Sequence, residues 1–245
     1  MNFIEAKKRR EKGGINVVDE SFLSEHSDNS EGFSKTEIDV DIAWQVVRKL
    51  VKNYPELILF REWGTALQVN SYRSPVNTGI SFIANFKELS EMRDRFRVIP
   101  PLKRDSEQKW RTNLSGVPIN FHVAYQGRLG KVFGIPISNL IENTETIAGV
   151  KTLNKEGILV CHVAAILDEQ NSLEIENEKN GAIALLTFSE EKWNWEMLRN
   201  IVSPYDNPSP ERLEKCLQVL QDLNKEISGR SLWTINIAEK FKPPF

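Results

Sequence analysis

The chain has 245 residues, of which 40% are hydrophobic and 27% are charged, which is the composition of an ordinary globular protein. The formal net charge of −2 excludes a general electrostatic attraction to nucleic acid or to an anionic membrane. The two cysteines have no paired spacing, and no apolar run approaches the roughly 20 residues that a bilayer span requires. We therefore expect a cytoplasmic protein without disulfides, without a zinc cluster and without membrane contact.

The first segment, residues 1–36, differs in composition from the rest and is expected to form a flexible charged arm. An acidic stretch rich in serine and asparagine follows a basic cluster made of Lys7, Lys8, Arg9, Arg10 and Lys12. Blocks of opposite charge with few apolar side chains cannot bury enough surface to fold alone. A solvated tail is the simpler interpretation, and binding of a partner or of a phosphate backbone by the basic cluster is the alternative.

Residues 37–135 alternate between helical and strand patterns. Apolar residues at a spacing of three to four predict a first helix, and short apolar or alternating segments predict strands. The predicted elements are a helix over 38–53, a strand over 57–60, a turn at Gly64 with a helix over 65–69, a strand over 78–86, a helix over 87–96 and a strand over 116–125. This order favours an α/β (α+β) fold with a mixed sheet and packed helices.

Residues 136–245 have a mainly helical pattern. Helix-length apolar or amphipathic segments occupy 156–169, 177–188, 189–202 and 209–227. Pro208 and Pro210 mark the beginning of the last of these helices. We expect this half to form a bundle-like second layer or a small domain.

One stretch of the predicted sheet resembles a known family. FREWGTALQV (60–69), then Arg73 and then TGISF (78–82), resembles the opening motif of the nucleotidyltransferase superfamily, especially its abortive-infection-type toxins and minimal nucleotidyltransferases. These relatives have Gly-Gly-Thr-Ala-Leu, an arginine and Asp-Ile-Asp-Phe. Gly64, Thr65 and Arg73 match that motif, whereas Gly79 and Ser81 stand at the positions of the two aspartates.

The resemblance continues downstream, over roughly residues 40–190, and it departs from the family at further functional positions. Asn120, in GVPINFHV, stands where the family has its third carboxylate. His162 takes the place of a lysine that contacts the nucleotide in the family, and Lys179 is followed by Asn180 where the family often has Lys-Asp. The resemblance therefore implies a nucleotidyltransferase fold with altered functional positions.

The replacements remove the charged oxygen ligands on which two-metal catalysis depends. Glycine supplies no ligand, and a serine hydroxyl or an asparagine amide carries no negative charge to offset the dehydration of Mg²⁺. We therefore expect no catalytic residue and no metal at Gly79, Ser81 and Asn120, and no cofactor. The resemblance implies a pseudoenzyme that binds a protein partner in a larger complex, such as an antiviral-defence, toxin–antitoxin-like or nucleoprotein complex.

The resemblance also implies candidate ligand-binding residues, which are Gly64, Thr65, Arg73, His162 and Lys179. One alternative is an active divergent nucleotidyltransferase that uses Mg²⁺ and NTP, takes carboxylates from elsewhere, such as Glu62 or Asp94, and transfers NMP to RNA or protein. Another is an interaction protein with no ligand in the cleft. An accidental likeness would leave Gly64 as a turn residue and Asn120 as a polar residue on an edge strand.

Two further groups of residues bear on function. The basic region around 93–111 supplies the nucleic-acid candidates Arg104, Lys109, Trp110 and Arg111, because cationic and aromatic side chains together hold phosphates and stack on bases. A solvated helix face is the simpler account of this region, since acidic residues are interspersed, and nucleic-acid binding is the alternative. Cys161 and His162 are neighbours in a predicted helix and point about 100° apart, so they cannot act as nucleophile and base.

Overall fold

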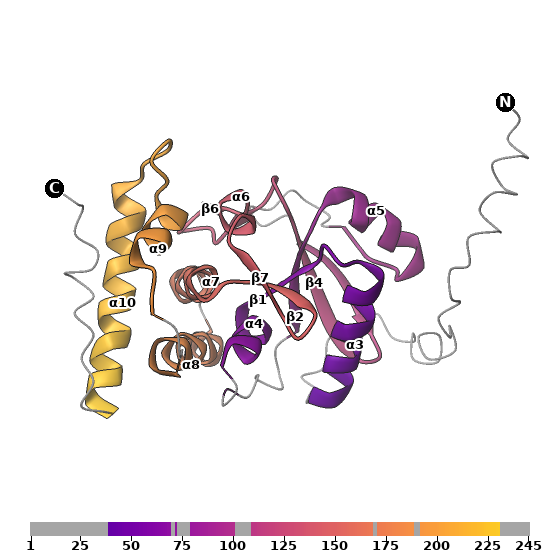
Figure 1. The fold of residues 1–245 in the computed structure, drawn as a ribbon, viewed down its shortest axis with the longest axis horizontal. Helices are drawn as coiled ribbons and strands as arrows, with labels where there is room; N and C mark the ends of the chain where they lie inside the picture. The colour runs from indigo at the N-terminus through magenta and orange to yellow at the C-terminus, as the bar shows by residue number, and fades with distance from the viewer. Residues whose placement is uncertain are drawn as a thin grey trace, which may run out of the picture.

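The computed structural model of the chain describes residues 39–69, 72, 79–100, 109–168, 171–188 and 192–230. The expected arm over 1–36 and the candidates Arg73 and Arg104 lie outside the described residues. The predicted α/β fold class is confirmed, because a mixed sheet lies between helices on both of its faces (Figure 1). Among the described residues, no helix combines the length and the apolar character needed to cross a membrane.

Six strands form the sheet, in the order β3-β4-β2-β1-β8-β7. Their bounds are β1 Ile58–Phe60, β2 Ile80–Ala84, β3 Lys109–Leu114, β4 Val117–Val123, β7 Thr144–Ile147 and β8 Val150–Leu153. The pairs β2–β4 and β1–β8 are parallel, and the other pairs are antiparallel. A separate small sheet pairs β5 (Arg128–Leu129) with β6 (Ile135–Pro136).

Two amphipathic helices cover one face of the sheet. In α3 (Val40–Asn53), the side chain of Asp39 accepts hydrogen bonds from the first-turn backbone and caps the helix. In α5 (Phe86–Arg95), Asn85 and Glu88 form a capping box. The apolar sides of both helices pack with inward-facing strand residues such as Phe82 and Phe121 in one core cluster.

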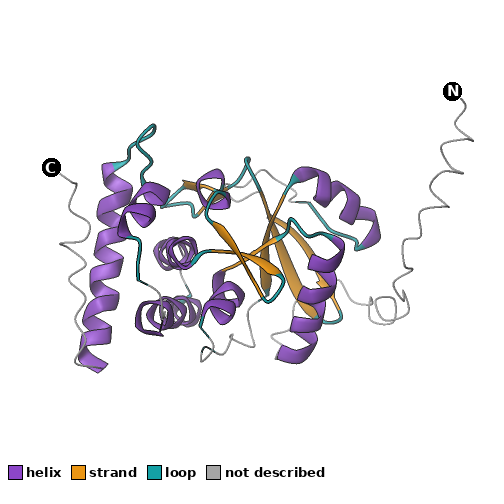
Figure 2. Cartoon of the chain, viewed as in Figure 1, coloured by secondary structure: helices purple, strands orange, loops and turns teal. Residues whose placement is uncertain are grey.

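The other face of the sheet carries the remaining helices. They are α4 (Arg61–Gln68), α6 (Ser138–Ile141), α7 (Lys155–Asp168), α8 (Ser172–Phe188), α9 (Trp195–Val202) and α10 (Pro210–Arg230). Figure 1 shows α7 and α8 end-on beside the sheet, with α10 crossing on their outer side. Residues 155–165 of α7 are all buried, so this helix is the centre of the second core cluster, and Figure 2 shows it among other helices beside the sheet.

Several features differ from the sequence-based prediction. Lys109, Trp110 and Arg111 lie in strand β3, so the expected solvated helix face is wrong for these residues. Helix α4 begins at Arg61, directly after β1, so Gly64 is a helical residue and the prediction of a turn there is wrong. A Cβ atom on Gly64 would lie 3.0 Å from Cδ1 of Ile158, so this glycine permits close packing of α4 on α7. The hairpin β7–β8 adds two strands within a segment that was expected to be mainly helical, and Ala148 and Gly149 form its turn at positive φ.

Candidate functional site

The two strands that should carry the metal ligands of a nucleotidyltransferase are neighbours. In the parallel pair β2–β4, Ser81 lies directly opposite Asn120. Because register partners point to the same face of a sheet, their side chains lie side by side. The adjacency that the resemblance implies for these two positions is therefore present, although neither side chain carries a charge.

Gly79, the third altered position, lies two residues before Ser81 on the same side of β2. A Cβ atom at Gly79 would come within 2.9 Å of the carbonyl oxygen of Pro118 and 3.2 Å of Nδ2 of Asn120. Any side chain, an aspartate included, would therefore force the neighbouring strand to move. Among the described residues, no group of three His, Cys, Asp or Glu side chains could hold a metal ion.

Positive charge lies beside these positions. In the antiparallel pair β3–β4, Arg111 lies opposite Asn120, and Lys109 lies opposite His122. Trp110, between the two cations, points to the other face and is buried against the core cluster there. The face that holds Ser81 and Asn120 thus continues onto two cationic side chains at the edge of the sheet. We call Lys109, Arg111, Asn120 and His122 the cationic face.

His122 is a buried polar side chain on this face. It is fully buried, and neither of its ring nitrogens has a hydrogen-bond partner in the described part of the chain. Its ring meets the ring of Phe60 edge-on, with centroids 5.0 Å apart. Burial, together with the charges of Lys109 and Arg61, lowers the pKa of the His122 imidazole well below its usual value, so the ring is neutral.

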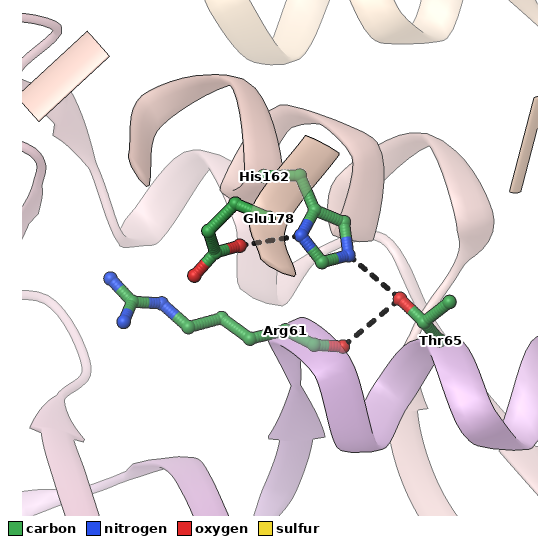
Figure 3. A network of polar contacts seen from close by, with 4 residues as sticks. All are labelled: Arg61, Thr65, His162 and Glu178. Carbon is green, nitrogen blue, oxygen red and sulfur yellow. Dashed lines mark hydrogen bonds and ion pairs between the residues drawn. The ribbon is translucent and has the colours of Figure 1, made fainter. Parts of the chain in front are cut away.

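A second polar cluster connects three helices on the same side of the sheet (Figure 3). In this buried network, Oγ1 of Thr65 lies 2.7 Å from Nε2 of His162, and Nδ1 of His162 lies 2.6 Å from Oε2 of Glu178. The carboxylate favours the tautomer with the proton on Nδ1, so Nε2 accepts from the hydroxyl of Thr65. That hydroxyl also lies 3.2 Å from the carbonyl oxygen of Arg61.

Burial shifts the ionisation of the groups around this network. It lowers the pKa of the His162 imidazole to about 4, which leaves the ring neutral at pH 7. Burial and the nearby Glu178 carboxylate raise the pKa of Glu62 to about 7. The positive charge of Arg61, the first residue of α4, lowers the pKa of Glu62 and so offsets part of this rise. The backbone of Arg61 has a φ of 58°, an uncommon conformation for arginine.

The order Thr65–His162–Glu178 matches the hydroxyl, imidazole and carboxylate of a nucleophilic triad, but burial rules that role out. Thr65 and His162 are both 0% exposed. A nucleophile must reach its substrate, and the hydroxyl of Thr65 lies inside the contact between α4 and α7. The buried network therefore joins α4, α7 and α8 as a structural unit.

The structure brings several candidates together. Thr65 and His162 are in contact, and Lys179 follows Glu178, the partner of His162, in α8. Lys109 and Arg111 share a face of β3, whereas Trp110 is 7% exposed, packs edge-on against Phe86 and so presents no open surface for a base. The basic cluster Lys7, Lys8, Arg9 and Arg10 lies outside the described residues.

Sequence reasoning missed the roles of Glu178, Arg61 and His122. Glu178 lies 16 residues from its partner His162 and on a different helix, so no local pattern predicts the contact. The alternation of Trp110, Thr112 and Leu114 was the signal that places Lys109 and Arg111 on one face of a strand.

No protein-family model matches the chain, and no curated protein matches it. A nucleotidyltransferase-like antigenic protein from Paracoccidioides brasiliensis is similar in structure, with a TM-score of 0.45 and 11% identity, over 79% of this chain and 94% of the other. The polyadenylate synthase of Megavirus is similar with a TM-score of 0.38 and 13% identity, over 63% of this chain and 32% of the synthase. Both TM-scores are below 0.5, so neither similarity carries an activity over to this chain.

Proposed function

We propose that this chain is a nucleotidyltransferase-fold protein that has lost two-metal catalysis and acts by binding, as a non-catalytic subunit of a larger complex. The observation that carries the proposal is the row formed by Ser81, Asn120 and Arg111 on neighbouring strands. Where the resemblance leads us to expect carboxylates, at Ser81 and Asn120, this row has a hydroxyl and an amide, and the next side chain in the row, Arg111, is a cation.

The charge of the row opposes a divalent metal ion. Mg²⁺ gives up its tightly held water only to charged oxygen ligands in near-octahedral geometry. Neutral Ser81 and Asn120 offer weak ligands, and the nearby guanidinium of Arg111 repels a cation. The position of Gly79 adds a steric obstacle, because a side chain there would meet the backbone of Pro118. Charge and space together disfavour a metal clamp.

The carboxylates that an active enzyme could use instead stand in other settings. Glu62 is buried beside Glu178 and His162, and its raised pKa disfavours the charged form that a metal needs. Asp94 lies exposed on α5, the helix that covers the opposite face of the sheet, and forms an ion pair with Arg93. Neither residue stands beside Ser81 or Asn120 on a strand.

Exposed apolar side chains beside the edge strand support a protein partner. Phe86 is 56% exposed and contacts Trp110 of β3, and Ile99 is 60% exposed and pairs with Arg111 through backbone hydrogen bonds. Register partners share a face of the sheet, so Ile99 lies on the side of Arg111, whereas Phe86 lies on the side of Trp110. Exposed large apolar side chains are common at interaction surfaces. A partner that covers Ile99 would contact the chain next to the cationic face.

The test is a transfer assay with the full chain, radiolabelled NTPs, Mg²⁺ or Mn²⁺, and RNA or protein as acceptor. We expect no label on any acceptor, and no thermal stabilisation that requires both the metal and the nucleotide. A metal-dependent transfer that disappears in Glu62→Gln or in Asp94→Asn would establish the active-enzyme alternative. Recovery of a stable partner in the absence of nucleotide would support the binding role.

A further inference from the structure

We infer that the cationic face, made of Lys109, Arg111, Asn120 and His122, binds phosphate groups directly, without a divalent ion. The inference rests on the proposed function in one respect, which is the absence of a metal clamp beside Ser81. It goes further by assigning the class of ligand and the side chains that hold it.

The register of the strands sets the geometry of the cationic face. Arg111 lies opposite Asn120, and Lys109 lies opposite His122, so the four side chains form a rectangle on one face of β3 and β4. Adjacent strands lie about 5 Å apart, and residues two positions apart along a strand are separated by about 7 Å. These spacings are short enough for one phosphate group above the face to contact more than one of the four side chains.

The side chains of the rectangle offer hydrogen-bond donors and positive charge. A guanidinium has five N–H donors, an ammonium three, an amide two and a neutral imidazole one. Arginine in particular binds phosphate oxygens in a bidentate manner, with charge-assisted hydrogen bonds. Arg111 is exposed and Lys109 is half-buried, so both cations border solvent at the edge of the sheet. This set of donors matches an anion rich in acceptors.

His122 supplies an independent indication that a ligand belongs here. Both nitrogens of its fully buried ring lack a hydrogen-bond partner in the described part of the chain, although such groups are satisfied in the great majority of cases. An unsatisfied buried group costs stability, so its presence points to a partner that is bound in another state. A neutral imidazole can donate its single N–H to a phosphate oxygen without adding charge. Because the His122 ring is fully buried, the oxygen reaches it only when the side chains of Lys109 and Arg111, which border solvent, move apart.

Phosphate groups reach proteins mainly on nucleotides and on nucleic-acid strands, and both share the chemistry that this face recognises. The net charge of the chain is −2, so the attraction is local to this edge and is screened by salt over about 10 Å at 0.1 M ionic strength. The binding should therefore weaken steeply as salt is added.

The experiment measures the binding of three probes to the full chain at low salt: tripolyphosphate, a fluorescent ATP analogue and a labelled single-stranded RNA of ten nucleotides. Calorimetry serves for the first probe and fluorescence anisotropy for the other two, each in EDTA and in Mg²⁺. We expect binding in EDTA that Mg²⁺ does not strengthen. ATP binding without RNA binding would identify a nucleotide as the source of the phosphate, and the reverse would identify a strand.

The variants separate the cationic face from the rest of the surface. Arg111→Glu should weaken binding at least tenfold, because it replaces a bidentate cation by an anion. Arg48→Glu makes the same change on α3, which packs on the opposite face of the sheet, and should alter binding less than twofold. His122→Phe keeps the ring shape without the N–H donor and should weaken binding about fivefold, with an unchanged circular dichroism spectrum.

Three outcomes would overturn the inference. They are absence of binding to all three probes, binding that requires Mg²⁺, and equal losses in Arg111→Glu and Arg48→Glu. Unchanged binding in His122→Phe would remove the imidazole from the site and overturn the assignment of the four side chains. These outcomes differ from the result that would contradict the proposed function. That result is a metal-dependent transfer of label. A chain that neither transfers label nor binds a probe would keep the proposed function and refute this inference.

Discussion

Gly181 and His162 approach so closely that a Cβ atom on Gly181 would lie 2.5 Å from Cε1 of the imidazole ring. The glycine lies one helical turn beyond Glu178 in α8, and the same ring makes a hydrogen bond with that glutamate. The missing side chain at Gly181 therefore leaves the space in which His162 reaches both Thr65 and Glu178. The geometry of the buried network depends on this residue.

Replacement of Gly181 by alanine should destabilise the protein. Alanine is the better helix former by about 1 kcal/mol, but here its methyl group would displace a buried ring that is held by two hydrogen bonds. We expect a loss of about 1–3 kcal/mol in the free energy of unfolding, as for other overpacked sites. Urea denaturation measures this change. In the background of His162→Ala the same replacement should be harmless, and equal costs in both backgrounds would contradict the explanation.

The stability of the chain should depend on pH through Glu62. Its pKa is about 7 in the folded protein and near 4.5 in the unfolded chain, so the folded state binds more protons between these values. The protonated Glu62 therefore contributes stability that is fully present below pH 4.5 and is lost as the pH rises through 7. The free energy of unfolding falls by about 3 kcal/mol over this range. His162, whose pKa is lowered, acts in the opposite direction between pH 4 and 6.5.

A comparison with Glu62→Gln isolates the contribution of Glu62 from that of His162. The variant should gain stability relative to the wild-type protein as the pH rises from 4.5 to 7, by about the same 3 kcal/mol. Denaturation curves at half-unit pH intervals test this. A difference between the two proteins that stays constant with pH would show that Glu62 ionises normally in the folded state.

His122 has no hydrogen-bond partner among the residues that the structure describes, so it should reduce the stability of the free protein. Phenylalanine has a similar shape and no buried polar atoms, so His122→Phe removes an uncompensated desolvation cost. We expect the free energy of unfolding to rise by about 1–3 kcal/mol. The matched control is His162→Phe, which removes one hydrogen bond from Thr65 and one from Glu178 and should destabilise the chain. A loss of stability in both variants would mean that His122 is satisfied.

Replacement of Gly79 by alanine should destabilise the protein, whereas replacement of Ser81 by alanine should not. In Gly79→Ala the new Cβ meets the backbone of Pro118, so we expect a loss of about 1–3 kcal/mol of stability. Ser81→Ala only removes a hydroxyl and adds no atoms, so its effect should be much smaller. Thermal unfolding of the two variants shows the contrast, and equal midpoints would remove the steric argument about this position.

The two thiols should be unreactive in the folded protein. Cys161 and Cys216 are both fully buried, and burial raises the pKa of both thiols, that of Cys216 to about 12. Because the thiolate is the reactive form, a thiol reagent should label neither residue before unfolding and both after it. Rapid labelling of the native chain at pH 8 would show that a thiol is accessible.

Much of the fold follows from local sequence patterns. The periodic apolar residues of α3 and the prolines at the start of α10 mark their helices. The alternating segments 78–86 and 116–125 became β2 and β4, which are neighbours as the motif order implies. The hairpin β7–β8 escaped prediction because its polar strands lack a hydrophobic alternation and its turn, Ala148–Gly149, is not one of the common turn pairs.

The candidate site also has a part that the sequence predicts and a part that it does not. The motif located Thr65 and His162, which lie 97 residues apart and yet make contact in the structure. The contact of Glu178 with His162, and the close approach of that ring to Gly181, depend on how α7 packs on α8. Such packing involves both helices at once, so it leaves no local pattern in the sequence. The pairing of Arg111 with Asn120 likewise follows from strand register, which tertiary packing determines.

Helix α7 belongs to neither half of the chain alone. It contacts α4, which follows the first strand of the sheet, and also α8, α9 and α10, so separating the halves would leave its apolar surface in water. Amide protons of residues 155–168 should therefore exchange with deuterium only when the entire molecule opens. Either half produced as an isolated fragment should fail to hold its structure.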